Sequence, residues 1–238
     1  MLWQAALVGA APEAGRETEH GMVDYAKARA AMVDCQVRPA DVTRYAVIAA
    51  MLDVPRERFV PLAQRPLAYA ELQVPLAPGR VLLDARTLAK MLDALEIRDR
   101  DLVLTVGAGY GYASVIAARM AASVVALEDN PDLAQHLEGN LAALQADTVL
   151  VERGPLTEGA PGSAPFDVIL VEGGVERVPQ ALLDQLAEGG RLAAIRMNGV
   201  LGQCRIWRRA GDGFSSRAAF DASAPVLPGF DAERSFTF

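Results

Sequence analysis

A glycine-rich segment and the acid that follows it are the residues of this sequence best suited to chemistry. The segment G-A-G-Y-G-Y at 107–112 lies between the apolar run Leu102 to Val106 and a helical pattern that opens at Ala113. Glycine lacks the Cβ that would keep a ligand away from the backbone, so such a turn suits a nucleotide-like ligand. Glu128 lies 21 positions after Gly107, at the end of the next apolar run. An acid there can accept hydrogen bonds from a ribose diol.

The spacing of the glycines distinguishes between two kinds of nucleotide. A dinucleotide fingerprint reads G-x-G-x-x-G, but its third glycine position holds Tyr112, and Gly111 comes one place early. The spacing G-x-G-x-G resembles that of methyltransferases that use S-adenosyl-L-methionine (AdoMet), which has no pyrophosphate. AdoMet is therefore the expected cofactor, and NAD(P) remains a minor alternative. The expected cofactor-binding residues are Gly107, Ala108, Gly109, Gly111, Tyr112 and Glu128.

The elements that would position these residues follow from the apolar pattern. Short apolar runs alternate with helical stretches, which is typical of a parallel sheet covered on both faces. These runs are Leu102 to Val106, Ser123 to Leu127, Thr148 to Val151, Val168 to Val171 and Arg191 to Ile195. Cys204 to Arg209 and Arg217 to Ala222 predict a strand pair that closes one edge of the sheet. The expected fold class is α/β, a Rossmann-like, mostly parallel, doubly wound sheet with an antiparallel C-terminal edge.

The first part of the chain predicts helices and a long loop. Helical patterns extend from Tyr25 to Phe59 and from Thr87 to Leu95, whereas the prolines of Val60 to Val81 predict little regular structure. Long loops in compact domains usually serve or cover a site. We therefore expect a helical segment with a substrate-side loop over 22–95, forming one compact unit with an AdoMet-binding domain over 96–238. Residues 1–21 are expected to be a flexible extension, with Met22 as an alternative start.

Composition narrows the functional classes. The chain has 23 Lys and Arg against 30 Asp and Glu, a net charge of -7, which argues against a partner held by phosphate neutralisation. Cys35 and Cys204 cannot form a disulfide framework or a four-cysteine zinc site, and this favours a reducing compartment. His20 and His136 are predicted to be surface groups. We expect a cytoplasmic protein without a metal, a nucleic-acid partner or a membrane span, and the sequence leaves its oligomeric state open.

From about Met32 to Val226 the sequence resembles the protein-L-isoaspartate O-methyltransferase family. V-P-R-E-R-F-V-P at 54–61 is close to that family's VPRxxFVP block, the most family-specific stretch here. V-L-T-V-G-A-G-Y-G-Y at 103–112 is similar to V-L-E-I-G-x-G-S-G-Y, and residues 79–91 align with the segment that usually begins G-Q-T-I-S-x-P. The resemblance implies transfer of the AdoMet methyl group to an isoaspartyl carboxylate of a damaged protein, initiating its repair. A protein or peptide with an isoaspartyl residue is the implied partner.

Departures from the family pattern concern the chemistry rather than the fold. Leu83 stands at the position of the family's active-site serine. Thr105 replaces the acid that precedes the family's glycines, and Pro155 replaces the Asp that contacts adenine. A carboxylate acceptor is already a nucleophile at neutral pH, so positioning matters more than a general base. Asp84 could take over the orienting role of the serine, and Glu172 could face the cofactor or the acceptor.

No residue is assigned as catalytic with certainty, and Leu83, Asp84 and Glu172 are the expected substrate-side residues. The alternatives are that Leu83 is only a core residue and that Glu172 is a solvated acid. The alternatives for the whole chain are a methyltransferase of a different substrate and a non-catalytic AdoMet-binding protein.

Overall fold

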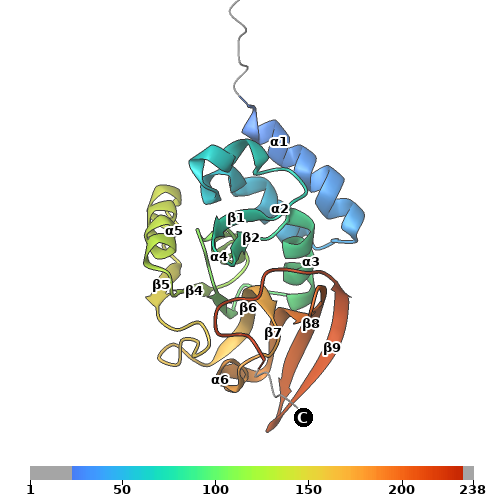
Figure 1. Ribbon diagram of the computed structural model, residues 1–238, viewed down its shortest axis with the longest axis vertical. Coiled ribbons are helices and arrows are strands. Elements are labelled where there is room, and N and C mark those ends of the chain that lie inside the picture. Colours follow the sequence, from blue (N-terminus) through green and yellow to red (C-terminus); the bar gives the residue numbers. More distant parts are fainter. Residues whose placement is uncertain (1–22, 233–238) are drawn as a thin grey trace, which may run out of the picture.

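A seven-stranded sheet forms the centre of the computed structural model, which describes residues 23–232 (Figure 1). Its strands are β3 (Leu102–Val106), β4 (Ser123–Glu128), β5 (Val149–Arg153), β6 (Phe166–Val175), β7 (Leu186–Asn198), β8 (Leu201–Ala210) and β9 (Gly213–Asp221). The order across the sheet is β5-β4-β3-β6-β7-β8-β9. Neighbouring strands from β5 to β7 pair in parallel. Strand β8 pairs antiparallel with both β7 and β9. The predicted fold class is confirmed.

The strand order reverses at β3, which lies between β4 and β6. From β3 the chain builds the sheet outward through β4 and β5, and then returns to the other side of β3 to add β6 and β7. In open α/β sheets, ligands bind outside the carboxyl ends of the strands at such a reversal. The glycine loop at 107–111 follows β3, and Glu128 ends β4, so both lie at this place.

Burial along the strands explains why their sequence patterns differ. Successive side chains of β3 enter different hydrophobic clusters, with Val103 in one and Leu104 in the other, because the sheet is covered on both faces. Both residues are fully buried, so the run reads as continuously apolar. In β8, by contrast, buried Cys204 and Ile206 alternate with more exposed neighbours, which gives the mixed pattern of an edge strand pair.

The helices that flank the sheet are α3 (Ala85–Leu95), α4 (Tyr112–Ala118), α5 (Pro131–Leu144) and α6 (Gln180–Asp184). Local signals begin α5, because the Asn130 side chain accepts hydrogen bonds from two N–H groups of its first turn and Pro131 occupies the first helical position. Helix α6 is short because it ends at Asp184 and Leu186 already belongs to β7.

The N-terminal segment contains α1 (Tyr25–Met32), η1 (Val33–Val37), η2 (Arg38–Ala40), α2 (Tyr45–Asp53), η3 (Arg56–Phe59) and η4 (Leu62–Leu67). A two-stranded hairpin of β1 (Val74–Ala77) and β2 (Arg80–Leu82) follows. The prediction of little regular structure over residues 60–81 is therefore wrong. Prolines are tolerated in the edge strands and turn of a two-stranded hairpin, where few N–H donors are needed. The expectations for residues 1–21 and Met22 lie outside the described residues.

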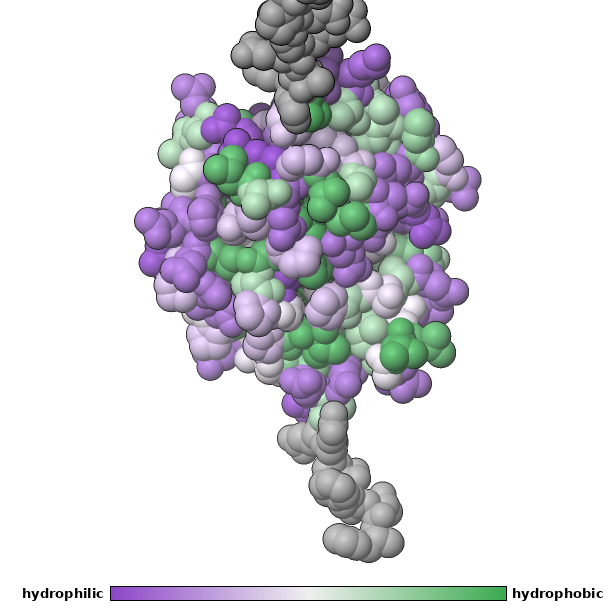
Figure 2. Space-filling view, turned by 45° about the horizontal axis from the view of Figure 1, so that its top comes forward, coloured by the Kyte–Doolittle hydropathy of each residue, from purple (hydrophilic) through white to green (hydrophobic). Residues whose placement is uncertain are grey.

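The N-terminal helices lie at one end of the molecule, and α6 and the β8–β9 hairpin lie toward the other (Figure 1). On the face shown in Figure 2, apolar side chains form several separate patches among polar ones. Among residues 23–232, no helix is long and apolar enough to cross a membrane.

Candidate cofactor and substrate site

The glycine loop is tied by its backbone to the end of the neighbouring strand. Gly107 and Ala108 both donate their N–H groups to the carbonyl oxygen of Leu127, at 3.0 and 3.1 Å. Gly107 and Gly109 have φ angles of 77° and 58°, in the left-handed region that L side chains rarely adopt. The loop therefore needs glycine at these positions, and its first two N–H groups already have acceptors within the fold.

Glu128 lies directly beside this loop, as the spacing of the sequence predicts. Its side chain is 0% exposed. The N–H group of Gly109 donates to its Oε2 at 2.7 Å, and the N–H group of Asn130 donates to its Oε1 at 3.0 Å. The structure thus brings the predicted acid and the predicted loop together in one buried group.

Arg80 belongs to the same group, although the sequence did not single it out. Its guanidinium donates to Glu128 in a bidentate pair, with Nη1 2.8 Å from Oε1 and Nη2 2.5 Å from Oε2. Nη1 also lies 2.9 Å from Oδ1 of Asp129. Burial alone would lower the pKa of Arg80, but hydrogen bonds and charges of these carboxylates raise it above its ordinary value. The one available signal was an arginine where the aligned family segment has glutamine.

Three side chains of the chain itself lie against the glycines. A Cβ built on Gly107 would lie 3.2 Å from Nη2 of Arg80 and 3.4 Å from Leu227, and one on Gly173 would lie 2.6 Å from Leu227. A Cβ on Gly109 would lie 2.8 Å from Leu76. The glycines therefore do leave room beside the backbone, but in this conformation Arg80, Leu227 and Leu76 occupy it. A ligand that approaches these glycines from the Cβ side needs these side chains to move.

Leu227 is held in place by a segment that we call the C-terminal strap, residues 224–230. After β9 the chain runs back across the sheet to the end of β6 (Figure 1). There Gly174 donates its N–H to the carbonyl of Pro225 at 2.8 Å, and Leu227 donates its own to the carbonyl of Gly174 at 2.9 Å. Leu227 is 1% exposed.

Glu172, on β6, is a further acid of this buried group. It is 7% exposed, so the alternative of a solvated acid is wrong. Burial raises the pKa of Glu172 well above its ordinary value, with Glu128 adding to the rise and Arg80 opposing it. Its Oε1 has no hydrogen-bond partner among the residues that the structure describes.

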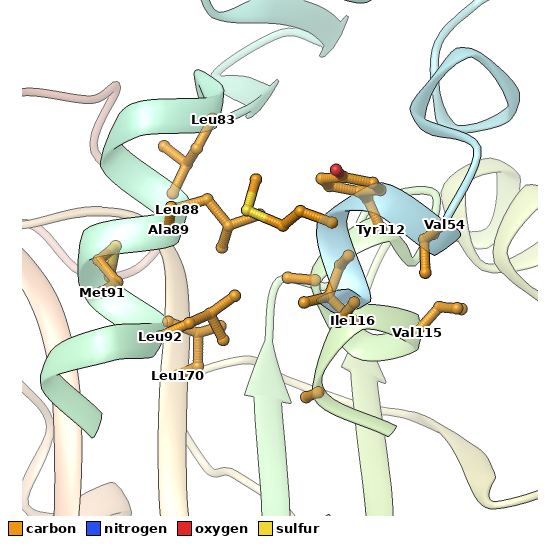
Figure 3. Close-up of a cluster of buried hydrophobic side chains, with 14 of the residues drawn as sticks. Val54, Leu83, Leu88, Ala89, Met91, Leu92, Tyr112, Val115, Ile116 and Leu170 are labelled. Atoms are coloured by element: carbon orange, nitrogen blue, oxygen red, sulfur yellow. The ribbon is translucent and has the colours of Figure 1, made fainter. Parts of the chain in front are cut away.

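On the predicted acceptor side, Leu83 is a core residue. It is 2% exposed and belongs to the cluster drawn in Figure 3, as do Leu88 and Tyr112. Asp84 is the N-cap of α3, and its Oδ1 accepts the N–H of Thr87 at 2.8 Å. The hairpin residues Leu76 and Arg80, from the region expected to hold the substrate-side loop, lie against the cofactor loop instead.

Arg56, from the VPRxxFVP-like block, fixes the backbone of this region. It is fully buried, and it donates to the carbonyl oxygens of Ala68 at 2.6 Å and Leu83 at 2.7 Å. Its guanidinium lies 5.0 Å from the ring centre of Tyr112. Tyr112 is 1% exposed and also packs against Phe59, so its predicted contact with AdoMet stays a prediction.

Two positions that depart from the family pattern, Thr105 and Pro155, carry uncharged side chains. The hydroxyl of Thr105 lies 2.7 Å from that of Ser114, so a neutral pair replaces the family's acid. Pro155 is exposed. His136 is also exposed, as predicted, and its ring stacks on Tyr110 at 4.3 Å between ring centres.

The fold, the glycine loop and the acid at the end of β4 define a Rossmann-like AdoMet-dependent methyltransferase. Residues 28–210 match the family model described as protein-L-isoaspartate(D-aspartate) O-methyltransferase (PCMT), and the chain belongs to this family. The predicted family, the activity of an AdoMet-dependent O-methyltransferase and the AdoMet cofactor are thereby confirmed at the level of the family.

Individual relatives agree with this assignment. The chain is 40% identical over 209 residues to a protein-L-isoaspartate O-methyltransferase of Methylorubrum extorquens, which covers 87% of this chain and 91% of the relative. It is 42% identical over 161 residues to the enzyme of that name from Gloeobacter violaceus, covering 68% and 78%. A solved putative protein-L-isoaspartate O-methyltransferase from Plasmodium falciparum, in complex with S-adenosyl-L-homocysteine, shares the fold at 19% identity with a TM-score of 0.71, covering 85% of this chain and 97% of that one.

Proposed function

We propose that this chain methylates isoaspartyl carboxylates in damaged proteins, and that it does so in the cytoplasm. The observation that carries the proposal is the buried Glu128 beside Gly109 at the reversal of strand order, within a chain that belongs to the PCMT family. Cys35 and Cys204 are both free, which supports a reducing compartment.

The proposed cofactor residues are those of the glycine loop, Gly107, Ala108, Gly109, Gly111 and Tyr112, together with Glu128. Bound AdoMet supplies a methyl group that is activated by its sulfonium centre. The loop allows close approach of the ligand, and the carboxylate of Glu128 would orient it through the ribose diol. In the described conformation these groups are held by other parts of the chain, so the proposal requires a second, open conformation.

For the acceptor, the chain has to provide position rather than a base. The isoaspartyl group is already ionised at neutral pH, and its oxygen is the nucleophile. Because the side chain of Leu83 is part of the core, it offers the acceptor no polar atom. In our proposal Glu172, in its protonated form, donates to the acceptor oxygen, and Asp84 accepts from an N–H group of the peptide. Excluding water from the site is the remaining contribution of the fold.

A methyl-transfer assay tests the substrate. The protein is incubated with AdoMet labelled in its methyl group and an isoaspartyl peptide, and base-labile methyl ester is counted. The aspartyl form of the same peptide is the matched control. We expect ester on the isoaspartyl peptide alone. Equal background counts on both peptides, from a protein that binds AdoMet, would reject the isoaspartyl substrate.

The buried Leu83 favours a second candidate, a methyltransferase with a different carboxylate substrate. A leucine at the family's serine position removes a hydroxyl that could orient a polar acceptor. Labelled esters formed on other carboxylates, with none on the isoaspartyl peptide, would support this candidate. AdoMet binding without any transfer would instead support a non-catalytic AdoMet-binding protein.

A further inference from the structure

We propose that Arg80 and Leu227 compete with AdoMet for its own site, so that cofactor binds only after both side chains leave the glycine loop. This inference rests on the proposed function, because it concerns the same site. In this proposal Arg80 lowers the affinity for the cofactor, whereas the other residues of the site determine which cofactor binds.

The hydrogen-bond capacity of Glu128 is the first argument. An ionised carboxylate has about four acceptor positions, two on each oxygen. Oε1 accepts from Arg80 and from the backbone of Asn130, while Oε2 accepts from Arg80 and from the backbone of Gly109. All four positions are therefore in use. A ribose diol can gain access only by replacing a donor, and the side chain of Arg80 can leave without unfolding the loop.

The space beside the glycines is the second argument. Leu227 lies within van der Waals distance of the position of a Cβ on Gly107, and closer than that to one on Gly173. A ligand that uses the close approach offered by these glycines would collide with it. Leu227 is carried by the C-terminal strap, whose hydrogen bonds to Gly174 hold it there. Opening of the site therefore requires a movement of the strap or of this side chain.

The charge of the group explains why the closed arrangement is favoured. The side chain of Arg80 is 5% exposed and that of Glu128 is 0% exposed, so water screens their attraction weakly. Asp129 adds a second, partly exposed carboxylate to the same guanidinium. Because AdoMet binds only the open fraction, its apparent Kd is the intrinsic Kd divided by that fraction. An open fraction of about 1% would weaken binding about a hundredfold.

Calorimetric titration with S-adenosyl-L-homocysteine, at fixed pH and salt, measures the competition. Arg80→Gln removes the cation and introduces the residue that the aligned family segment has at this position. We expect it to bind at least tenfold more tightly than the wild type, and Arg80→Gln combined with Leu227→Ala to bind more tightly still. Arg86→Gln is the matched control, because Arg86 is an exposed arginine on α3 and makes the same change of charge. Its affinity should equal that of the wild type.

Two further measurements remain informative if Arg80→Gln fails to fold. Leu227→Ala alone leaves the ion pair in place and should tighten binding several-fold. In the wild type, saturating S-adenosyl-L-homocysteine should speed hydrogen exchange of the Leu227 amide, because that amide loses its bond to Gly174 when the strap moves. A ligand that only stabilised the closed fold would slow this exchange.

The outcomes separate the inference from the proposed function. If wild type and variants bind with the same affinity and the wild type methylates isoaspartyl peptide, the competition is refuted and the function stands. If neither the wild type nor the double variant binds, both are refuted. Tighter binding by the variants, without any methyl transfer, supports the competition and refutes the function.

Discussion

Two buried arginines near the site bind different kinds of partner. Arg56 is 0% exposed and donates to backbone carbonyls of Ala68 and Leu83, whereas Arg80 is 4% exposed and donates to carboxylates. Burial lowers the pKa of Arg56, while the partners of Arg80 raise its pKa above the ordinary value despite burial. The backbone carbonyls that Arg56 binds have no proposed role with a ligand. The carboxylate of Glu128, which Arg80 binds, is proposed to bind the ribose of the cofactor.

The comparison separates a structural contact from an exchangeable one. The contacts of Arg56 connect η3 to the segment before α3, and they would be the same with or without a ligand. Those of Arg80 occupy an acid that the fold places where nucleotides bind. Substitutions at Arg56 should therefore change stability alone, and substitutions at Arg80 should change stability and affinity in opposite directions.

The largest loss of stability is expected for Arg56→Met. It leaves two buried carbonyl oxygens without donors, at about 1–3 kcal/mol each, so we expect a loss of about 4 kcal/mol in the free energy of unfolding. Urea denaturation measures it. Arg58→Met is the control in the same turn, since Arg58 is exposed, and it should cost less than about 0.5 kcal/mol. A loss below about 1 kcal/mol for Arg56→Met would show that the carbonyls find other donors.

A double-mutant cycle on Arg80 and Glu128 should give the next largest effect. Arg80→Gln leaves a buried carboxylate without its cation, and breaking such a pair costs about 3 kcal/mol or more. Adding Glu128→Gln removes the stranded charge, so the double variant should be more stable than the sum of the single losses predicts by about 2 kcal/mol. If the two losses in the free energy of unfolding were additive, the Arg80–Glu128 pair would contribute nothing to stability. Arg80 could then leave Glu128 without cost.

Leu83→Ser tests whether residue 83 contacts the methyl acceptor or serves only as a core residue. Replacing a buried leucine by a small residue costs about 2–5 kcal/mol, and we expect a loss near the lower end, about 2.5 kcal/mol, with Leu83→Ala as the control for the cavity. Because the side chain lies in the cluster of Figure 3, the new hydroxyl should not raise methyl transfer to an isoaspartyl peptide. A gain with Ser but not with Ala would show that this position alone limits the activity.

The sequence predicted the sheet and one half of the site for physical reasons. Parallel strands buried on both faces leave uninterrupted apolar runs, and their carboxyl ends meet at one edge, so Gly107 and Glu128 were expected to be neighbours. Arg80 could not be placed in this way. Its position depends on a short hairpin with two prolines, and its partner Glu128 is 48 residues away along the chain.

Leu83 and Leu76 illustrate the same limit at the level of single residues. Alignment with a family motif assigns Leu83 to a role, but whether its side chain enters the core depends on the packing of α3 against α2 and β7. Leu76 lies in a strand too short to show an alternating pattern, so nothing in the sequence directs it toward Gly109.

The smallest expected effect is a pH dependence of the stability of the fold. It is expected near Arg80, where the buried Glu172 lies, and not near Arg56. Glu172 has a pKa well above its ordinary value of about 4.3, because it is buried. The stability that its protonated form contributes is complete below the unfolded pKa and is lost as the pH rises through the folded pKa. Glu172→Gln stays neutral throughout, so its Tm should rise relative to that of the wild type as pH increases.

Thermal unfolding of both proteins between pH 4 and pH 8 measures this difference, with about 2–4 °C expected for each kcal/mol. Glu158→Gln, at an exposed position, is the control for loss of one negative charge. Removing Arg80 as well should enlarge the effect, because Arg80 is the group that opposes the rise in the Glu172 pKa. A Tm difference that does not change with pH, with or without Arg80, would mean that Glu172 is hydrated and does not share the buried charge of the site.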